Sequence, residues 1–243
     1  RPRRCQRGDP RVTDARFPGR PVRIQLSPRM FSDYLKGQEP RQLLEKRMRE
    51  EGRMPPGQSA SIKWPILHVG DDPVFDAATW DFRTGGLVEA PLTLNWTQMA
   101  ALPRVEIVSD FHCVTRWSTF DNRWEGVSIR EILSRAKPIP EATHVMAVGH
   151  IGDRRYGYST NLPLADLDRD DVLLAMRRNG EDIPNEHGGP LRLVVPHLYA
   201  WKSCKWIRGL IFMEADKAGY WEQHGYHMRG DPFREERFGR ANP

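Results

Sequence analysis

A strand-like apolar segment, Val105–Val108, leads directly into the run DFHCVTRWS at residues 110–118. Cys113 lies inside this run, and no second cysteine is near enough in the sequence to form a disulfide or a zinc pair with it. A single thiolate at the end of a strand can bind a soft metal whose other ligands come from a cofactor. For an isolated cysteine the alternative is a buried structural side chain. The surrounding sequence has to decide between these two interpretations.

The positive charge of the chain is concentrated at its N-terminus. The 243 residues carry a net charge of +5, but residues 1–30 contain nine arginines against Asp9 and Asp14. The rest of the chain is therefore slightly acidic, and no element interleaves basic with aromatic residues. A nucleic-acid-binding protein needs a basic patch on its folded surface, so we expect no nucleic-acid partner.

Composition also limits where the protein works. No apolar run approaches the roughly 20 residues that cross a bilayer, so we expect no membrane-spanning segment. Three cysteines are too few for a disulfide scaffold, which favours a reducing compartment and therefore the cytoplasm. A periplasmic location would require that an export signal had been removed before Arg1.

The pattern of short elements predicts a mixed α+β fold with several β-sheets and short helices. A helix is expected within Pro40–Glu51, and two capping-box patterns, Asn95 with Gln98 and Ser128 with Glu131, each mark the start of another. Strands are expected at residues 80–84, 92–94, 105–108, 143–148, 155–160, 172–177, 191–195 and 206–213. This order lacks the regular alternation of a doubly wound sheet.

Turn signals and composition divide the chain into segments. The Asn-Gly pair at residues 179–180 predicts a hairpin turn. We expect a flexible Arg/Pro-rich arm at residues 1–40, a helical lead-in at 41–59, one oxidoreductase domain at 60–235 and a C-terminal tail at 236–243.

Four blocks of sequence, in the same order, resemble the molybdopterin-binding domain of the sulfite oxidase superfamily. They are FHCVTRWS at 111–118 with RWEGV at 123–127, YSTNLPL at 158–164, GPLRLVVP at 189–196 and WKSCKW at 201–206. The similarity spans residues 60–235 and is greatest to the short, haem-free bacterial members. That group also includes the catalytic subunit of periplasmic methionine sulfoxide reductase.

The resemblance implies two cofactor components, molybdenum and molybdopterin. In this family one cysteine thiolate completes the coordination of the metal, and Cys113 matches that ligand. Cys204 lies in a strand-like run and keeps the structural interpretation, while Cys5 receives no role. His112 would point away from Cys113 on an extended backbone, so it either serves the pterin or packs behind the site.

The resemblance assigns the pterin phosphate to Lys202, Ser203 and Lys205. Together these residues supply two cations and a hydroxyl within four positions, which suits a phosphate. In a regular strand the two lysines would face opposite sides. Either the segment is a loop, or only one lysine reaches the phosphate; a solvated basic edge is the alternative.

Three further residues are implied in cofactor binding. Arg192 and His197 occupy family positions that hydrogen-bond the pterin, and His68 aligns with a segment that contacts the pterin near the metal. A surface or core histidine is the alternative for His68 and His197. The pair His224 and His227 lacks further ligands at metal-binding spacing, so we expect a surface tail there.

The family catalyses oxygen-atom transfer and passes electrons to a separate carrier. Tyr158 matches a substrate-pocket tyrosine, with cross-strand packing as its alternative, and Arg116 could place charge over the open side of the metal. Arg154 and Arg155 could add the cations that an oxyanion needs. The residues after Cys113 nevertheless depart from the Asn-Arg-Arg pattern of sulfite oxidases.

We therefore predict a molybdopterin-dependent oxidoreductase that acts on a small-molecule substrate, either a sulfur oxyanion or an S- or N-oxide. No haem-attachment motif is present, so the electron partner would be another protein or a quinone-linked subunit. Two other classes stay open. One is a pterin-binding module without turnover, and the other is an enzyme that uses Cys113 as a nucleophile.

Overall fold

The structure of the protein is a computed structural model that describes residues 40–151 and 154–239. The chain from Pro40 onward forms one compact unit. The N-terminal arm expected at residues 1–40 falls, except for Pro40, outside the described residues, as does Cys5. The division into segments at these boundaries therefore stays a prediction.

One β-sheet contains five strands in the order β3-β2-β11-β6-β7. β11 pairs in parallel with β2 and antiparallel with β6, so the sheet is mixed. The strands are β2 Asp81–Gly86, β3 Thr93–Asn95, β6 His144–Ile151, β7 Arg154–Pro163 and β11 Ile207–Met213. Together with the second sheet they confirm the mixed α+β class expected from the sequence.

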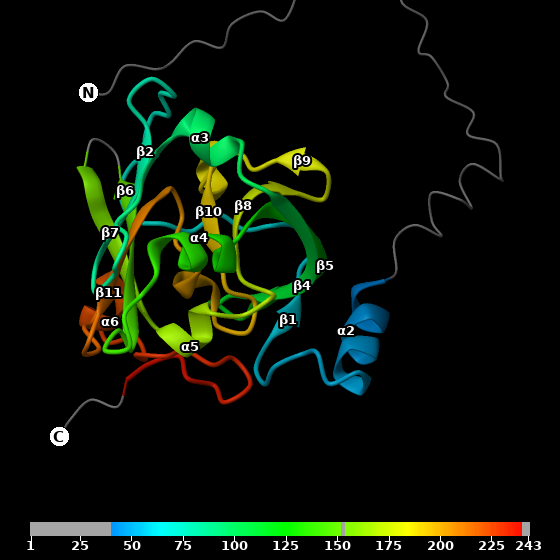
Figure 1. The fold of residues 1–243 in the computed structure, drawn as a ribbon. Coiled ribbons are helices and arrows are strands. Elements are labelled where there is room, and N and C mark those ends of the chain that lie inside the picture. The colour runs from blue at the N-terminus through cyan, green and yellow to red at the C-terminus, as the bar shows by residue number, and fades with distance from the viewer. Residues whose placement is uncertain (1–39, 152–153, 240–243) are drawn as a thin grey trace, which may run out of the picture. The chain divides into compact units, whose positions relative to one another are not determined.

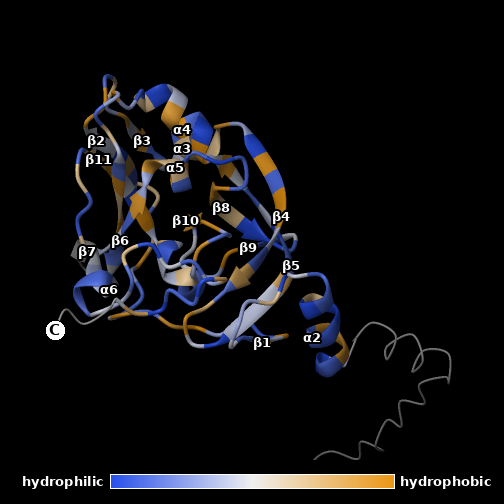
Figure 2. Ribbon diagram, turned by 90° about the horizontal axis from the view of Figure 1, so that it is seen from below, coloured by the Kyte–Doolittle hydropathy of each residue, from blue (hydrophilic) through white to orange (hydrophobic). Residues whose placement is uncertain are grey.

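The second sheet has the order β1-β5-β8-β10, with β4 paired to β5 and β9 paired to β8. Its strands are β1 Ser59–Ala60, β4 Arg104–His112, β5 Trp117–Ser128, β8 Leu173–Arg178, β9 Glu181–Asp182 and β10 Arg192–Val194. Figure 2 shows hydrophobic and hydrophilic residues alternating along β4, as expected of a strand with one solvated face. The long hairpin of β4 and β5 carries Cys113 at its turn.

Short helices connect and separate the sheets. They are α2 Arg41–Glu50, α3 Trp96–Ala100, α4 Ile129–Ala136, α5 Leu164–Leu167 and α6 Tyr220–Gln223, with 3-10 turns η1 Asn185–His187 and η2 Ala200–Lys202. In Figure 1, α4 lies between the strands of the two sheets. None of the helices in the described residues combines the length and the apolar composition needed to cross a membrane. The cellular compartment stays a prediction.

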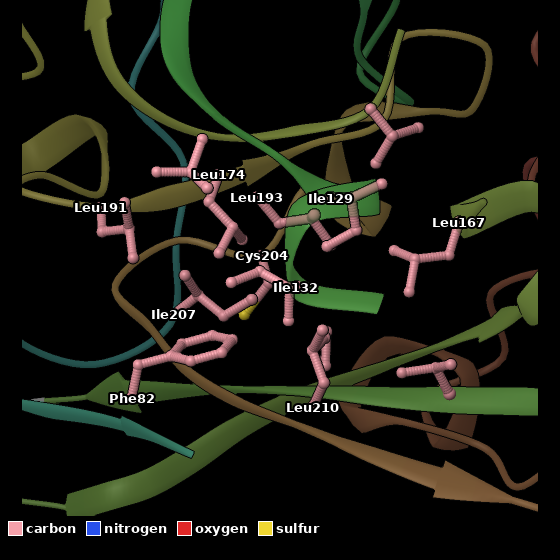
Figure 3. Packing of buried hydrophobic residues seen from close by; sticks show 14 of the residues in the cluster. Phe82, Ile129, Ile132, Leu167, Leu174, Leu191, Leu193, Cys204, Ile207 and Leu210 are labelled. Atoms are coloured by element: carbon pink, nitrogen blue, oxygen red, sulfur yellow. The ribbon is translucent and has the colours of Figure 1, made fainter. Parts of the chain in front are cut away.

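The main hydrophobic core lies between the sheets and is centred on α4. Ile129 and Ile132 of α4 are fully buried. Figure 3 shows these two side chains between Leu174 of one sheet and Phe82 and Leu210 of the other. Complete burial of such a side chain stabilises the fold by about 1.5–3 kcal/mol, so this layer holds the two sheets together.

The two predicted capping boxes behave differently. At α3 the Asn95 side chain accepts from the Gln98 N–H while the Gln98 side chain accepts from the Asn95 N–H, as predicted. At α4 the Ser128 hydroxyl accepts from the Arg130 N–H instead, and Glu131 pairs with Arg135. The prediction of a second capping box was therefore wrong, because the Glu131 side chain instead forms a salt bridge with Arg135 one turn further along the helix.

All eight predicted strands are present, and the Asn-Gly turn joins β8 to β9 with φ of +53° and +84°. Strand β5 was not predicted from the sequence. Its polar middle, Asp121 to Arg123, interrupts the apolar alternation that signals a strand. A register shift opposite this segment, between Ser109 and Phe111, accommodates the irregularity.

Candidate active site

A cavity of about 750 Å³, its open mouth included, lies beside Cys113. Its wall is built by the turn after β4, residues 64–69, η1, the segment around η2, and residues 221–226. The wall includes several residues singled out in the sequence, namely Cys113, Tyr158, His68, Arg192, Ser203 and Lys205.

Cys113 lies in a tight turn between β4 and β5. Its N–H donates to the Trp117 carbonyl at 2.9 Å, and its own carbonyl accepts from the Arg116 N–H at 3.0 Å. Arg116 has φ of +71°, a left-handed conformation that is unusual for a residue with a β-carbon. The turn places the Cys113 side chain in the cavity wall.

The Cys113 thiol is 5% exposed, and its sulfur lies 3.2 Å from the Thr115 hydroxyl. Burial raises the pKa of the thiol, while the Thr115 hydrogen bonds and the charges of Arg237 and Lys205 oppose this shift. The net effect favours the neutral thiol over the thiolate. A bound metal cation is the partner that stabilises the deprotonated form in such a position.

Lys205 supplies an ammonium group to the cavity. Its Nζ donates to the Glu186 carbonyl at 2.6 Å and lies 3.2 Å from His68 Nδ1, while His68 Nε2 lies 2.8 Å from Asp72 Oδ1. Burial, reinforced by the charge of Arg192, lowers the pKa of Lys205 to about 7. An anionic group in the cavity would counteract both effects and keep Lys205 protonated.

Arg192 is the second cation of the wall, but its hydrogen bonds are used by the protein. It donates to the carbonyls of His187 at 2.7 Å and Ser203 at 3.0 Å. Its guanidinium lies over the rings of Trp64 and Phe111, and burial lowers its pKa to about 10. Arg192 therefore braces the wall and contributes charge from behind it.

His187 belongs to the cavity but was not recognised in the sequence. Its ring stacks on Trp64 with centroids 3.8 Å apart, and burial lowers its pKa to about 4. Its Nδ1 is buried and has no hydrogen-bond partner within residues 40–151 and 154–239. The available signal was its position directly before Gly188-Gly189-Pro190, at the edge of a block that resembles the family.

Aromatic rings form another part of the wall. Tyr226 stacks on Trp221 at 4.9 Å and meets Trp201 edge-on at 5.1 Å. The Tyr158 hydroxyl donates to the Trp201 carbonyl at 2.7 Å, and burial raises its pKa well above the usual value. Tyr158 is therefore a neutral wall residue whose proton is already shared, which does not support its predicted role as a donor to an oxyanion.

Lys202 does not line the cavity. Its ammonium donates to the Asn161 carbonyl at 2.8 Å and to Met228, and it forms a fully buried salt bridge of 2.6 Å with Glu222. The same Glu222 oxygen accepts from Trp201 Nε1 at 2.9 Å. Of the two lysines only Lys205 lines the cavity, and the segment begins as a 3-10 turn instead of a regular strand. Which lysine binds the phosphate stays a prediction.

Ser203 lies between the two lysines and does line the cavity. Its Oγ accepts from the Val195 N–H at 2.9 Å, which leaves the hydroxyl proton as a donor. Cys204 is completely buried in the main core and lies outside the cavity wall, in agreement with its structural interpretation.

Three predicted site residues besides Lys202 lie outside the cavity wall. His112 packs behind it, with Nδ1 2.8 Å from the Ser118 hydroxyl and a pKa lowered to about 4 by burial. His197 Nε2 lies 3.2 Å from Asp166 Oδ1. Arg116 is exposed, and its guanidinium lies near Gly57. The structure does not support contacts of these three with cofactor or substrate.

The segment at residues 224–227 is only partly the surface tail that we expected, since His224 and Gly225 are exposed. Tyr226 lines the cavity, and His227 Nδ1 accepts from the Arg229 and Gly230 N–H groups. In the described part of the chain, no group of three His, Cys, Asp or Glu side chains forms a metal site. The side chains of residues 154 and 155, which we considered as further cations, fall outside the described set.

A buried cysteine in a turn on a cavity wall with both aromatic and polar residues is consistent with a cofactor-dependent enzyme, and comparison with known proteins defines the class. The model of the oxidoreductase molybdopterin binding domain matches residues 69–221. The chain belongs to this family and is a molybdopterin-binding oxidoreductase, which confirms the resemblance to the sulfite oxidase superfamily.

Individual relatives refine this comparison. The chain is 45% identical over 190 residues to the uncharacterized oxidoreductase YuiH of Bacillus subtilis, covering 78% of this chain and 93% of YuiH. It is 28% identical to the protein-methionine-sulfoxide reductase catalytic subunit MsrP of Gluconobacter oxydans, over 65% of this chain and 56% of MsrP. The sulfane dehydrogenase SoxCD of Paracoccus pantotrophus shares 25% identity and a TM-score of 0.51, over 59% of this chain and 40% of the SoxCD chain.

The residues of the cavity fit a molybdopterin. The unpartnered His187 Nδ1, the free donor of Ser203 and the ammonium of Lys205 are polar groups of the kind that a pterin and its phosphate require. Cys113 is the one thiol on the cavity wall, and a metal held there needs its remaining ligands from a cofactor.

Proposed function

We propose that this protein catalyses oxygen-atom transfer from a neutral S-oxide or N-oxide, with molybdenum bound by Cys113 and molybdopterin. The observation that carries the proposal is the setting of Cys113, a buried thiol beside a cavity whose wall is aromatic on one part and polar on another. When bound, the metal and its pterin supply the two-electron redox chemistry. The protein supplies ligation, positioning and exclusion of water.

The polar part of the wall suits the cofactor. Lys205 and the Ser203 hydroxyl would hold the phosphate, while His187 would hydrogen-bond the pterin. His68, whose two ring nitrogens lie beside Lys205 and Asp72, would orient the Lys205 ammonium. Arg192 would act through these groups, since it holds the carbonyls of His187 and Ser203. A phosphate near Lys205 restores the ammonium charge that burial opposes.

The aromatic part of the wall suits an uncharged substrate. Trp201, Trp221 and Tyr226 offer apolar surface and ring faces, which interact favourably with thioether sulfur and with methyl groups. An oxyanion such as sulfite needs converging cations because burying an unpaired charge is costly. The described wall contains Arg192, which is held by carbonyls, and Lys205, which the phosphate would use.

The overall reaction consumes electrons that the chain must receive from outside. Reduction of an S-oxide breaks the sulfur–oxygen bond and consumes two electrons and two protons, giving a thioether and water. A separate carrier protein or quinone-linked subunit would donate the electrons. The relative MsrP is named as a catalytic subunit, which supports such an arrangement.

Use of Cys113 as a nucleophile has less support. Within the described residues, the hydrogen-bond partner of its sulfur is the Thr115 hydroxyl and not a histidine. Burial also raises the pKa of the thiol, whereas a nucleophilic cysteine needs a lowered pKa.

The test compares two cysteines in protein produced by a host that makes molybdopterin. We expect Cys113→Ala to lose molybdenum and to reduce turnover of dimethyl sulfoxide or methionine sulfoxide by about a hundredfold or more. Cys204→Ala is the matched control, because Cys204 is also buried but lies outside the cavity, and this variant should keep its molybdenum and its turnover. Molybdenum is measured by mass spectrometry and turnover with a reduced dye.

Two results would contradict the proposal. Equal molybdenum content and turnover in Cys113→Ala and the wild type would remove Cys113 as the ligand. Faster dye reduction with sulfite than dye oxidation with the S-oxides would replace the neutral oxide by an oxyanion as the substrate class.

A further inference from the structure

Two side chains from distant parts of the chain hold the turn that carries Cys113. Gln58 Nε2 donates to the Cys113 carbonyl at 2.9 Å. Arg237 Nη1 donates to the carbonyl of the next residue, Val114, at 2.6 Å. The main-chain carbonyls of two consecutive residues in this turn are therefore held by side chains that lie 55 and 123 residues away in the sequence.

Both side chains are buried and incompletely paired. Gln58 is 4% and Arg237 is 6% exposed, and the Gln58 Oε1 and Arg237 Nε atoms are buried without hydrogen-bond partners in the described residues. Burying such groups costs free energy that apolar residues would not incur. Their presence beneath the turn is more consistent with a requirement for its geometry than with stability alone.

Arg237 also ties the turn to the rest of the molecule. Its Nη2 donates to the Pro56 carbonyl at 3.2 Å, and its guanidinium lies 5.0 Å from the centre of the Tyr199 ring. Figure 1 shows the red C-terminal segment returning toward the chain that leads into β1. The residue that we expected within a C-terminal tail is thus a buried link between three segments.

Neither residue lies within residues 69–221, which the family model matches. Gln58 comes from the lead-in before β1, and Arg237 follows the last helix. These two segments therefore complete the surroundings of Cys113 from outside the family domain. The left-handed Arg116, whose N–H donates to the Cys113 carbonyl, shows that the turn has a demanding conformation.

We propose that Gln58 and Arg237 are positioning residues that fix the turn 113–116, so that the Cys113 sulfur faces the cavity in the orientation required for a metal ligand. The last clause rests on the proposed function; the holding of the turn does not. Each donor acts on a carbonyl of the turn, whereas the hydrogen-bond partner of the sulfur in the described residues is the Thr115 hydroxyl.

Hydrogen exchange of the cofactor-free full-length protein tests the holding of the turn. We expect Arg237→Met and Gln58→Met to speed exchange of the amides of Cys113 and Arg116 by about tenfold, the effect of losing one buried hydrogen bond. Arg208→Met is the matched control, because Arg208 is 7% exposed and donates to the Asp81 carbonyl in the other sheet. Its effect should be confined to β2 and β11.

A second measurement, on the molybdenum-loaded protein, tests the orientation of the sulfur. X-ray absorption should count fewer sulfur neighbours of molybdenum in Arg237→Met and Gln58→Met than in the wild type and Arg208→Met. Arg237→Lys, which keeps a donor and a charge, should restore part of the difference. A purely structural role would lower stability without changing this count.

The outcomes separate the two levels of the proposal. Equal exchange at residues 113–116 in Arg237→Met, Gln58→Met and Arg208→Met overturns the holding of the turn. Faster exchange with an unchanged sulfur count overturns the positioning of the ligand. Absence of molybdenum from the wild type would contradict the proposed function, while the exchange result would still decide how the turn is held.

Discussion

Lys202 and Lys205 lie three residues apart, yet they occupy regions of opposite character. Lys202 is completely buried in a network where Glu222, Asn161 and Met228 accept its hydrogen bonds. Lys205 lines the cavity, and burial lowers its pKa to about 7. A carboxylate neutralises the Lys202 ammonium, whereas no carboxylate of residues 40–151 and 154–239 lies at hydrogen-bond distance from the Lys205 ammonium.

The difference shows how burial alone fails to identify function. A buried charge with a matched partner contributes to structure, and removing one member of the pair leaves the other unpaired. A buried cation without a paired anion in a cavity wall is prepared for an anionic ligand. The two lysines therefore give opposite predictions for stability and for cofactor binding.

The largest effect is expected from Lys202→Met, which leaves Glu222 buried without its counter-ion. Stability should fall by about 3–5 kcal/mol, the usual cost of breaking a buried pair. Denaturant unfolding of the cofactor-free protein measures this change. Lys46→Met on α2 is the control, since Lys46 is 72% exposed and its pair with Glu50 is solvated. An equally small loss in both variants would show that the Lys202 network is not structural.

Lys205→Met should instead change the pH dependence of stability. The unfolded chain keeps the lysine proton up to a pKa near 10.5, whereas the folded protein releases it at about 7. Between pH 7 and 9 the unfolded state therefore binds more protons, and the free energy of unfolding of the wild type rises with pH by up to about 1.4 kcal/mol per pH unit. The variant should lack this contribution, and denaturant titrations across the range measure it.

This prediction is contradicted if the free energy of unfolding changes with pH in the same way for the wild type and Lys205→Met from pH 7 to 9. Lys46→Met again serves as the control and should retain the slope of the wild type. In loaded protein, Lys205→Met should also lose most of its molybdopterin, because the phosphate loses a charge-assisted hydrogen bond. Lys202→Met should keep cofactor in whatever fraction remains folded.

The sequence predicted the fold well where patterns are local. Interactions between residues close in the sequence determine the helix at 41–50, the predicted strands, the Asn-Gly turn and the capping box at Asn95. β5 was missed because its pairing with β4 and β8, and not its own alternation, decides its conformation. Tertiary pairing can override a weak local pattern.

Residues of the candidate site could be predicted where they lie in a segment that resembles the family, as His68 also does. Cys113 and Lys205 were found in this way, but Lys202 was assigned to the cofactor because its partner Glu222 is 20 residues further along the chain. His187, Tyr226 and Arg237 were missed for the same reason. Their roles come from stacking or hydrogen bonds with distant segments, which no local pattern reveals.

The smallest effect is expected at Ser203, which lies between the two lysines and shares features of both regions. Its Oγ accepts from the buried Val195 N–H, while its hydroxyl proton remains available to the cavity. Ser203→Ala should lower stability by about 1 kcal/mol through the lost hydrogen bond and weaken cofactor retention by less than tenfold. Unfolding and molybdopterin content measure the two effects.

Ser128→Ala is the matched control, because the Ser128 hydroxyl also accepts from a main-chain N–H but lies at the start of α4, outside the cavity wall. It should lower stability similarly and leave cofactor content unchanged. A loss of cofactor in Ser203→Ala as large as that in Lys205→Met would mean that the hydroxyl, and not the ammonium, is the main phosphate ligand. The contrast between the two lysines would then rest on stability alone.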